Sequence, residues 1–169
     1  MERKTVLFVC SFNSVRSQMA EGFINARCPK LYLAESAGIA PAGLNPYAVA
    51  VMKEAGIDIS KHQSKKIGTF AKVRFDYLIT LCDRAKQAGA GILPPAGKTI
   101  HRAFDSPSEI RKNKNEILAD FRVLRDEMGD WLDETFPDCT EAGAVTGLSC
   151  DGIPVHSDSA EDEDREAIR

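Results

Sequence analysis

Cys10 and Arg16 have the residue types and the spacing of a site in which a nucleophile attacks a bound oxyanion. A cysteine thiolate attacks readily, and a guanidinium offers a planar fork of N–H donors to two oxygens of one tetrahedral anion. The loop between them and the residue that follows supply the candidate oxyanion-binding positions: Ser11, Phe12, Asn13, Ser14, Val15 and Ser17. The pattern predicts attack of sulfur on phosphorus or arsenic, although by itself it is only moderately specific.

The elements on either side of this loop strengthen the prediction. Residues 4–9 form the apolar run of a buried strand, and residues 18–27 have the apolar spacing of an amphipathic helix that stops before Pro29. A loop that leads from a strand into a helix directs backbone N–H groups and the helix dipole toward an anion. In that field Cys10 is expected to ionise readily, and Ser17 can donate its hydroxyl to the sulfur. The plain alternative is a buried cysteine at a strand end and a solvated arginine at a helix start.

The remaining patterns predict alternating strands and helices. Strands are expected at residues 31–35, 74–81 and 98–101, and helices at residues 46–55 and 116–136. Asn45 before Pro46 is a helix-start signal, and Ser106 to Glu109 matches a capping box with proline in the first turn. Such alternation indicates an α/β fold with a parallel sheet, in which ligands bind beyond the carboxyl ends of the strands.

Length and composition indicate one globular domain followed by an acidic tail. The chain has 169 residues, 43% of them hydrophobic, and a formal net charge of −3. Residues 1–137 carry 20 basic and 16 acidic side chains, whereas residues 138–169 carry 2 and 9. We therefore expect a catalytic domain over residues 1–137 and a flexible tail over residues 138–169. The small positive excess of the body is no basic patch, so we expect no nucleic-acid binding.

Other classes are excluded by what the sequence lacks. No window approaches 18 consecutive apolar residues, and the apolar run near the start is too short for a signal peptide. We therefore expect no membrane association and a cytoplasmic location. The five cysteines are widely spaced without a C-x-x-C pair, and the three histidines are scattered, which predicts neither a disulfide framework nor a metal site. Cys28 is expected to end a helix and pack.

The segment from Cys10 to Gly22, Cys-Ser-Phe-Asn-Ser-Val-Arg-Ser-Gln-Met-Ala-Glu-Gly, resembles the signature loop of the low-molecular-weight protein tyrosine phosphatase superfamily. More narrowly, it is similar to the thioredoxin-linked arsenate reductases on that fold. Further matching segments are Ser36–Gly38, Gly56–Ser60, His62, Thr80–Asp83, Ile92–Pro95 and His101–Pro107. The resemblance covers nearly all of residues 5–136 and implies a three-layer sandwich, with a four-stranded parallel sheet flanked by helices.

The resemblance implies a role for each matching residue and no bound cofactor. Cys10 would be the nucleophile, Arg16 and the loop amides would hold the oxyanion, and Asp105 would be the general acid that protonates the leaving oxygen. In the reductases a second cysteine, at the position of Cys82, attacks the arsenylated sulfur and arsenite leaves. A third cysteine shortly after it takes over the disulfide, which thioredoxin reduces. Residues 83–91 contain no cysteine, so that relay is incomplete here.

Three ways of completing the reaction stay open. Cys82 could form a disulfide with Cys10 that an external reductase such as thioredoxin opens. A low-molecular-weight thiol, with a glutaredoxin-type partner, could instead resolve the Cys10 adduct. Cys139 or Cys150 on the acidic tail could also reach the site, because loop closure costs little entropy. The plain alternatives are a buried Cys82 at a strand end and two exposed tail cysteines.

A second departure concerns a potassium site of the related reductases. Asn13, Glu21 and Ser36 match three residues near that ion, but Lys65 stands at the position of a carboxylate. We expect its ammonium group to take the place of the ion, so that activity does not depend on potassium. A solvated lysine is the plain alternative.

The resemblance favours an arsenate reductase that releases arsenite at the expense of thiols. The same loop and acid would also suffice for a phosphatase that hydrolyses phosphotyrosine or small phosphoesters through a phospho-cysteine. The missing third cysteine argues against the reductase. The form of the Asp105 loop, and the lack of an aromatic pair to flank a phosphotyrosine, argue against the phosphatase. A non-enzymatic anion sensor is a third hypothesis, weakened because Cys10, Arg16 and Ser17 are all intact.

Overall fold

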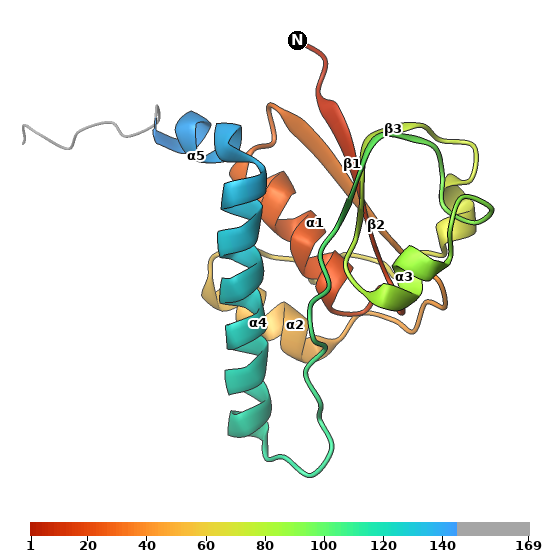
Figure 1. Cartoon of the computed structure of the whole chain (residues 1–169). Coiled ribbons are helices and arrows are strands. Elements are labelled where there is room, and N and C mark those ends of the chain that lie inside the picture. Colours follow the sequence, from red (N-terminus) through yellow and green to blue (C-terminus); the bar gives the residue numbers. More distant parts are fainter. Residues whose placement is uncertain (145–169) are drawn as a thin grey trace, which may run out of the picture.

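The computed structural model describes residues 1–144, which contain one sheet of four parallel strands in the order β2-β1-β3-β4 (Figure 1). The strands are β1 (Lys4–Cys10), β2 (Tyr32–Gly38), β3 (Phe75–Thr80) and β4 (Ala96–His101). Cys10 pairs with Gly38, and Val9 pairs with Thr80, so the carboxyl ends of three strands meet beside the candidate nucleophile. The predicted parallel α/β sheet is confirmed.

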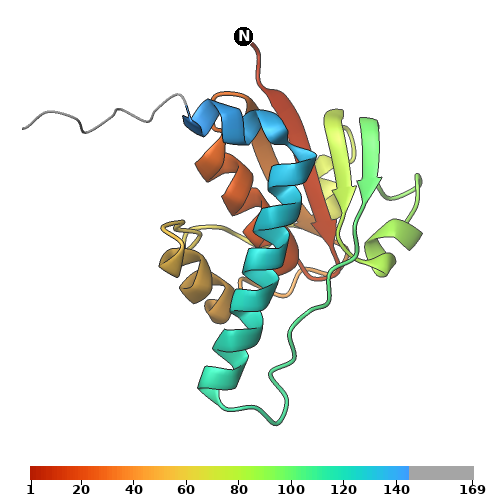
Figure 2. The ribbon, with the colours of Figure 1, turned by 60° about the vertical axis from the view of Figure 1, so that its left-hand side comes forward.

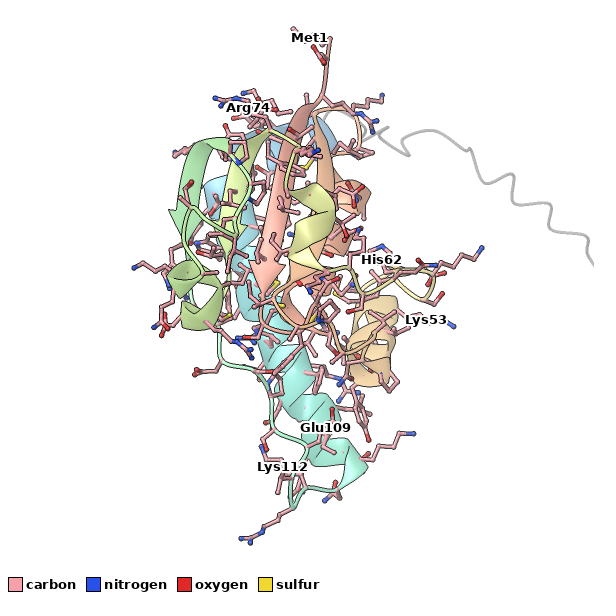
Figure 3. The ribbon with its side chains drawn as sticks, turned by 90° about the vertical axis from the view of Figure 1, so that its right-hand side faces the viewer. Met1, Lys53, His62, Arg74, Glu109 and Lys112 are labelled. Carbon is pink, nitrogen blue, oxygen red and sulfur yellow. A yellow bond between two sulfur atoms is a disulfide. The ribbon has the colours of Figure 1, made fainter. Side chains whose placement is uncertain are left out.

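Helices cover both faces of this sheet in the expected three-layer arrangement. On one face lie α1 (Arg16–Arg27) and α4 (Lys114–Thr135), and α2 (Pro46–Glu54) packs against both of these helices (Figure 2). The short 3-10 turn η1 (Ile67–Phe70) lies on the other face (Figure 3). A further short helix, α3 (Asp83–Gln87), follows the carboxyl end of β3. Because β1 is covered on both sides, its apolar run is fully buried.

The long helix α4 packs through the apolar stripe expected from the sequence. The buried apolar side chains of that stripe are Ile117, Phe121, Leu124, Met128 and Leu132. Burial of each side chain of this size contributes about 1.5–3 kcal/mol. Trp131 is half-buried and meets the ring of Phe104 edge-on, with the ring centroids 5.6 Å apart. This contact anchors the segment that carries the candidate acid.

The start of α4 differs from the expectation. Ser106 to Glu109 begins no helix, and residues 102–113 form an irregular connection that leads away from the sheet (Figure 1). The capping box belongs instead to Asn113, whose side chain accepts from two backbone N–H groups of the first turn. The carboxylate of Glu116 accepts in return from the N–H of Asn113. Both segments have the capping spacing, but only Asn113 directly precedes the apolar stripe that packs on the core.

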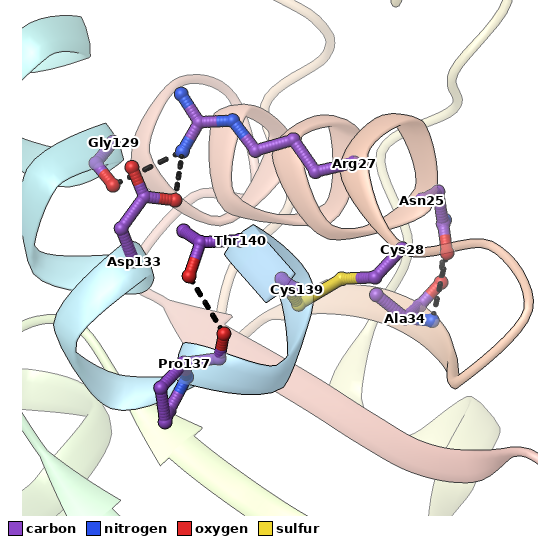
Figure 4. The surroundings of a disulfide bond; sticks show 9 residues. All are labelled: Asn25, Arg27, Cys28, Ala34, Gly129, Asp133, Pro137, Cys139 and Thr140. Atoms are coloured by element: carbon purple, nitrogen blue, oxygen red, sulfur yellow. Dashed lines mark hydrogen bonds and ion pairs between the residues drawn. A yellow bond between two sulfur atoms is a disulfide. The ribbon is translucent and has the colours of Figure 1, made fainter. Parts of the chain in front are cut away.

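Helix α5 (Pro137–Ala144) occupies the place where the sequence predicted the start of a flexible tail. Cys139 in this helix is buried and forms a disulfide with Cys28, which follows the end of α1, with the Cα atoms 5.1 Å apart (Figure 4). Cys28 ends the helix and packs, as expected, but the wide spacing of the cysteines gave no sign of this disulfide, and Cys139 lies in a helix instead of on a tail. Cys150 and the rest of the predicted tail lie outside the described residues.

An aromatic cluster explains why the chain turns back at this point. The ring of Phe136, between α4 and α5, is fully buried against Tyr32 and Tyr77, with centroid separations of 5.0 and 5.6 Å. These two tyrosines lie near the beginnings of β2 and β3, so α5 lies at the end of the sheet opposite the Cys10 loop (Figure 1). The disulfide and the candidate site are thus at opposite ends of the molecule.

No helix in residues 1–144 combines the length and the apolar character needed to cross a bilayer. No group of three or more His, Cys, Asp or Glu side chains gathers there in a way that could hold a metal ion.

Candidate active site

The loop between β1 and α1 turns its carbonyl groups outward. Each carbonyl oxygen from Cys10 to Ser14 accepts a hydrogen bond from outside the loop. The donors are the backbone N–H groups of Ile39, Ala40, Ala42 and Asn45, at 2.8–3.2 Å, and the side chains of Gln18 and Ser64. The N–H groups of residues 11–15 donate to no oxygen or nitrogen atom of residues 1–144. These amides are therefore left for an anion, and the N-terminus of α1 adds positive potential.

Two backbone features permit so tight a loop. Gly38, at the end of β2, lies against it, and a Cβ there would be 2.7 Å from the backbone nitrogen of Asn13 and 2.9 Å from the carbonyl carbon of Phe12. Asn13 itself has a φ of 46°, in the left-handed region that asparagine tolerates better than most residues. Its buried side chain accepts from the N–H of Lys65 at 2.7 Å. Glycine and asparagine thus fix the shape of the loop.

A chain of hydrogen bonds reaches the Cys10 sulfur from the core. Asn13 Nδ2 donates to Ser17 Oγ at 2.7 Å and to Ser36 Oγ at 2.9 Å. Because Ser17 Oγ accepts from Asn13, its own proton is available to Cys10 Sγ, 2.9 Å away. At the other end, Ser36 donates to the carboxylate of Glu21. This direction of donation stabilises negative charge on the sulfur and suits a thiolate nucleophile.

Glu21 is the charged group at the inner end of this chain. Burial raises the pKa of Glu21 above its ordinary value, while the hydrogen bond from Ser36 and the nearby Lys65 and His62 act in the opposite direction. Lys65 Nζ lies 3.8 Å from Glu21 Oε2 and also pairs with Glu35. The ammonium group therefore lies beside the carboxylate, as expected if it takes the place of an ion. The expected indifference to potassium stays a prediction.

Cys82 is a buried, free thiol on the same edge of the sheet. Cys82 is 7% exposed and lies two residues beyond the end of β3, directly after the buried Leu81. Cys82 Sγ lies 3.3 Å from the hydroxyl of Ser11, the residue after Cys10. The structure therefore brings the two thiols of the predicted relay to one loop. Cys139 is excluded from this site by its disulfide with Cys28.

Arg16 connects the anion loop to the segment that carries the candidate acid. Its Nη1 donates to the carbonyl of Phe104 at 3.1 Å, and the N–H of Phe104 donates to the carbonyl of Leu81 at 3.0 Å. Asp105 comes next, is exposed, and borders a hollow of about 440 Å³ beside α4. Its carboxylate accepts no hydrogen bond from residues 1–144, so the general-acid role stays a prediction, although its segment lies at the edge that Arg16 and Cys82 share.

Gln18 and Ser64 shape the site but are absent from the predicted site residues. Gln18 Nε2 donates to both oxygens of Asn13 and to the carbonyl of Gln63, and Gln18 Oε1 lies 3.0 Å from His62 Nδ1. A polar side chain on the buried face of an amphipathic helix is a signal that could have identified Gln18. Ser64 lies in a polar connection far along the chain, and nothing in its neighbours indicates the contact.

Sequence comparison decides the family. Residues 5–117 match the model described as low molecular weight phosphotyrosine protein phosphatase. The chain belongs to this phosphatase family. It is therefore an enzyme of the arsenate reductase or phosphatase type, on the fold and with the loop described above.

Relatives within the phosphatase family carry two kinds of name. An arsenate reductase of Bacillus licheniformis is 42% identical over 130 residues, which span 77% of this chain and 93% of the relative. An arsenate reductase solved in a phosphate-binding state is 31% identical, with a TM-score of 0.64 over 80% of this chain and 98% of its own. A low molecular weight protein tyrosine phosphatase from T. tengcongensis is 26% identical, with a TM-score of 0.68 over 80% and 99%.

Proposed function

We propose that the protein is an arsenate reductase in which Cys10 attacks arsenate bound in the loop that ends at Arg16. The observation that carries the proposal is the second free thiol, Cys82, held against Ser11 beside the nucleophile. Hydrolysis of a phosphoester needs one thiol, because water resolves the phospho-cysteine, whereas reduction of arsenate consumes two. The arsenate reductase names of relatives at about 40% identity support the same choice.

The chemistry follows from the positions of these groups. Arsenate binds through the loop amides and the Arg16 fork, and the Cys10 thiolate forms a bond to arsenic. One arsenate oxygen leaves as water, with Asp105 as a proton donor. A second thiolate then attacks the Cys10 sulfur, so that an S–S bond forms as the S–As bond breaks. The electron pair stays on arsenic, which is reduced from the pentavalent to the trivalent state and leaves as arsenite.

Cys82 is the second thiol in this proposal, and the product on the protein is a Cys10–Cys82 disulfide. Because residues 83–91 hold no cysteine, that disulfide has no third thiol in α3 to which it can pass. An external thiol must then reduce it by exchange. The donor is thioredoxin or a low-molecular-weight thiol with a glutaredoxin-type partner. Direct attack of a small thiol on the Cys10 adduct is the alternative route.

The test supplies purified protein with arsenate and each electron donor in turn, measures arsenite, and runs a chromogenic aryl phosphate in parallel. Arsenite release with any donor supports the proposal. The Cys82→Ser variant then separates the two routes, because loss of thioredoxin-supported turnover is expected only if Cys82 is the second thiol. Full turnover by Cys82→Ser with every donor would remove Cys82 from the mechanism.

A phosphatase is the second candidate, and Phe12 is the observation that favours it. This residue lies in the anion loop and is 47% exposed, so its ring could contact the ring of a bound phosphotyrosine. Turnover of the aryl phosphate without arsenite release from arsenate would replace the first proposal with this one.

A further inference from the structure

We propose that Arg84, which lies against Phe12 at the rim of the anion loop, recognises the carboxylate of a low-molecular-weight thiol reductant. The inference rests on the proposed arsenate reduction, because it concerns the thiol that completes that reaction. It assigns a specificity residue: Arg84 binds the reductant and takes up neither a proton nor an electron.

Arg84 follows Cys82 by two residues and lies against the loop that begins at Cys10. Cys82 is the cap residue of α3, and Arg84 lies in the first turn of that helix. The guanidinium carbon of Arg84 is 5.7 Å from the centroid of the Phe12 ring, and Phe12 lies in the loop that begins at Cys10. A guanidinium held over a ring keeps its N–H edges free for an anion that approaches in its plane.

The charge of Arg84 is not neutralised within the described part of the chain. Its side chain is exposed and forms no ion pair with any of residues 1–144. Arg102 provides the contrast: its guanidinium lies 5.1 Å from the centroid of the Phe104 ring, but it is paired with Glu127 at 3.1 Å. Arg84 therefore keeps a cation available for an external anion, next to an exposed apolar ring.

The anion that Arg84 binds is not the arsenate itself. Arsenate is held by the loop amides and Arg16, whereas the side chains of Phe12 and Arg84 are exposed to solvent. The proposed reaction brings an external thiol to the disulfide of Cys10 and Cys82. A carboxylate on that thiol accepts two N–H groups of the Arg84 fork, while its carbon chain contacts the ring. One cation and one ring match a small molecule better than the broad surface buried by a protein reductase.

The assisted step is ordinary thiol–disulfide exchange. The reductant thiolate attacks one sulfur of the Cys10–Cys82 disulfide, so that a mixed S–S bond forms and the other cysteine leaves as a thiolate. A second molecule of the same thiol attacks the mixed disulfide, restores the first cysteine, and carries away the oxidised reductant as its disulfide.

The test compares two thiols that differ in charge, 3-mercaptopropionate and 2-mercaptoethanol, as donors for arsenite release. Arg84→Gln is expected to lower kcat/KM for 3-mercaptopropionate by about five- to tenfold and to leave the value for 2-mercaptoethanol within about twofold. Arg84→Lys should fall between, because it keeps the charge and loses the fork. Arg74→Gln is the matched control, since it removes an exposed arginine at the opposite end of the sheet (Figure 3).

Three results overturn the proposal: equal losses with both thiols, no loss with either, or a loss confined to turnover with thioredoxin, which would indicate a protein docking site.

A second measurement without arsenate separates this inference from the proposed function. The reduced protein is mixed with 3,3′-dithiodipropionate or with 2-hydroxyethyl disulfide, and mixed disulfides on Cys10 and Cys82 are followed by mass. A selective slowing of the anionic reagent in Arg84→Gln supports recognition even if no donor yields arsenite, and equal slowing contradicts it.

Discussion

At the scale of single residues, Glu21 combines burial with charge at the inner end of the hydrogen-bond chain that reaches Cys10. Burial disfavours its ionised form, and the proton on Ser36, the Lys65 ammonium and His62 compensate in part. The carboxylate is therefore held at a cost in stability, and it fixes the donor direction along Ser36 and Asn13 toward the sulfur. Orientation of the nucleophile is therefore accompanied by a loss of some folding stability.

Replacement of this carboxyl group should change how stability depends on pH. Because burial raises the pKa of Glu21 in the folded state, its stabilising contribution is complete below the ordinary value of 4.5 and is lost as pH rises through the folded value. Glu21→Gln imitates the neutral form, so its urea midpoint should rise relative to the parent from about pH 4 to about pH 8. Glu35→Gln, which removes the exposed partner of Lys65, is the control and should show no such rise. A Glu21→Gln difference that stays constant or shrinks with pH would contradict the assignment.

Gly38 tests whether the shape of the loop sets its affinity for oxyanions. A methyl group at this position would press on the backbone of Phe12 and Asn13 at 2.7–2.9 Å, and backbone cannot move aside as a side chain can. Gly38→Ala should weaken phosphate binding, measured by calorimetry, at least about tenfold, or about 1.4 kcal/mol. Gly68→Ala is the matched control, because a Cβ there meets nothing within 4 Å. Equal affinity in the two variants would show that the close approach does not matter.

Residue types alone predicted the chemistry of the loop but not the groups that hydrogen-bond to its backbone and hold its shape. Cys10, Arg16 and Ser17 lie within eight consecutive positions, so strand, loop and helix signals place them together. Apart from Gln18, the donors that hold the carbonyls outward come from residues 39–45 and from Ser64, and a contact between such distant segments leaves no local trace in the sequence.

At the scale of elements, long segments with one clear period were predictable and short ones were not. The strands β1, β2 and β3 and the long helix α4 bury apolar residues whose spacing is visible in the chain, whereas the edge strand β4 has no fully buried residue. The short elements η1, α3 and α5 have four, five and eight residues, and their stability comes from packing rather than from local preference. The mistaken capping box at Ser106 has the same origin, since spacing alone does not say which segment meets the core.

The disulfide that joins the residue after α1 to α5 is a tertiary link that the sequence did not reveal, and it should contribute measurably to stability. It closes a separation of 111 residues, so its loss is expected to cost about 2–4 kcal/mol in the denaturant-derived free energy of unfolding. Cys28→Ala and Cys139→Ala should each cost this amount, and the double variant should cost little more than either. In dithiothreitol, the parent, the two single variants and the double variant should have similar free energies of unfolding. Additive losses, or an oxidised parent no more stable than the reduced one, would contradict a formed disulfide.

At the scale of the whole molecule, the site and the disulfide lie at opposite ends of one sheet. Cys10 and Cys82, the free thiols among residues 1–144, lie at the carboxyl ends of β1 and β3, and α5 lies at the end where the strands begin (Figure 1). The mild net charge of −3 is the sum of a basic excess in residues 1–137 and an acidic excess in residues 138–169. The cationic groups that matter to the proposed function are Arg16 and Arg84, both beside the anion loop.

The acidic segment beyond α5 is expected to be dispensable for this chemistry. Family similarity covers residues 5–117, and the site is assembled from residues before that limit. A chain ending at residue 144 should keep its melting temperature within about 2 °C and its arsenite release within about twofold. Cys150→Ser in the full chain should likewise be silent. A large loss of turnover in both proteins would show that Cys150 takes part as the resolving thiol.

The central claim is that the sulfur of Cys10 attacks arsenate and is then oxidised. The most direct measurement is a single turnover of the reduced protein with arsenate and no external donor, followed by arsenite determination and peptide mass mapping. We predict about one equivalent of arsenite per chain, a Cys10–Cys82 disulfide, and no arsenite from Cys10→Ser. Arsenite formation with Cys10 recovered as a free thiol, or by Cys10→Ser, would contradict the account.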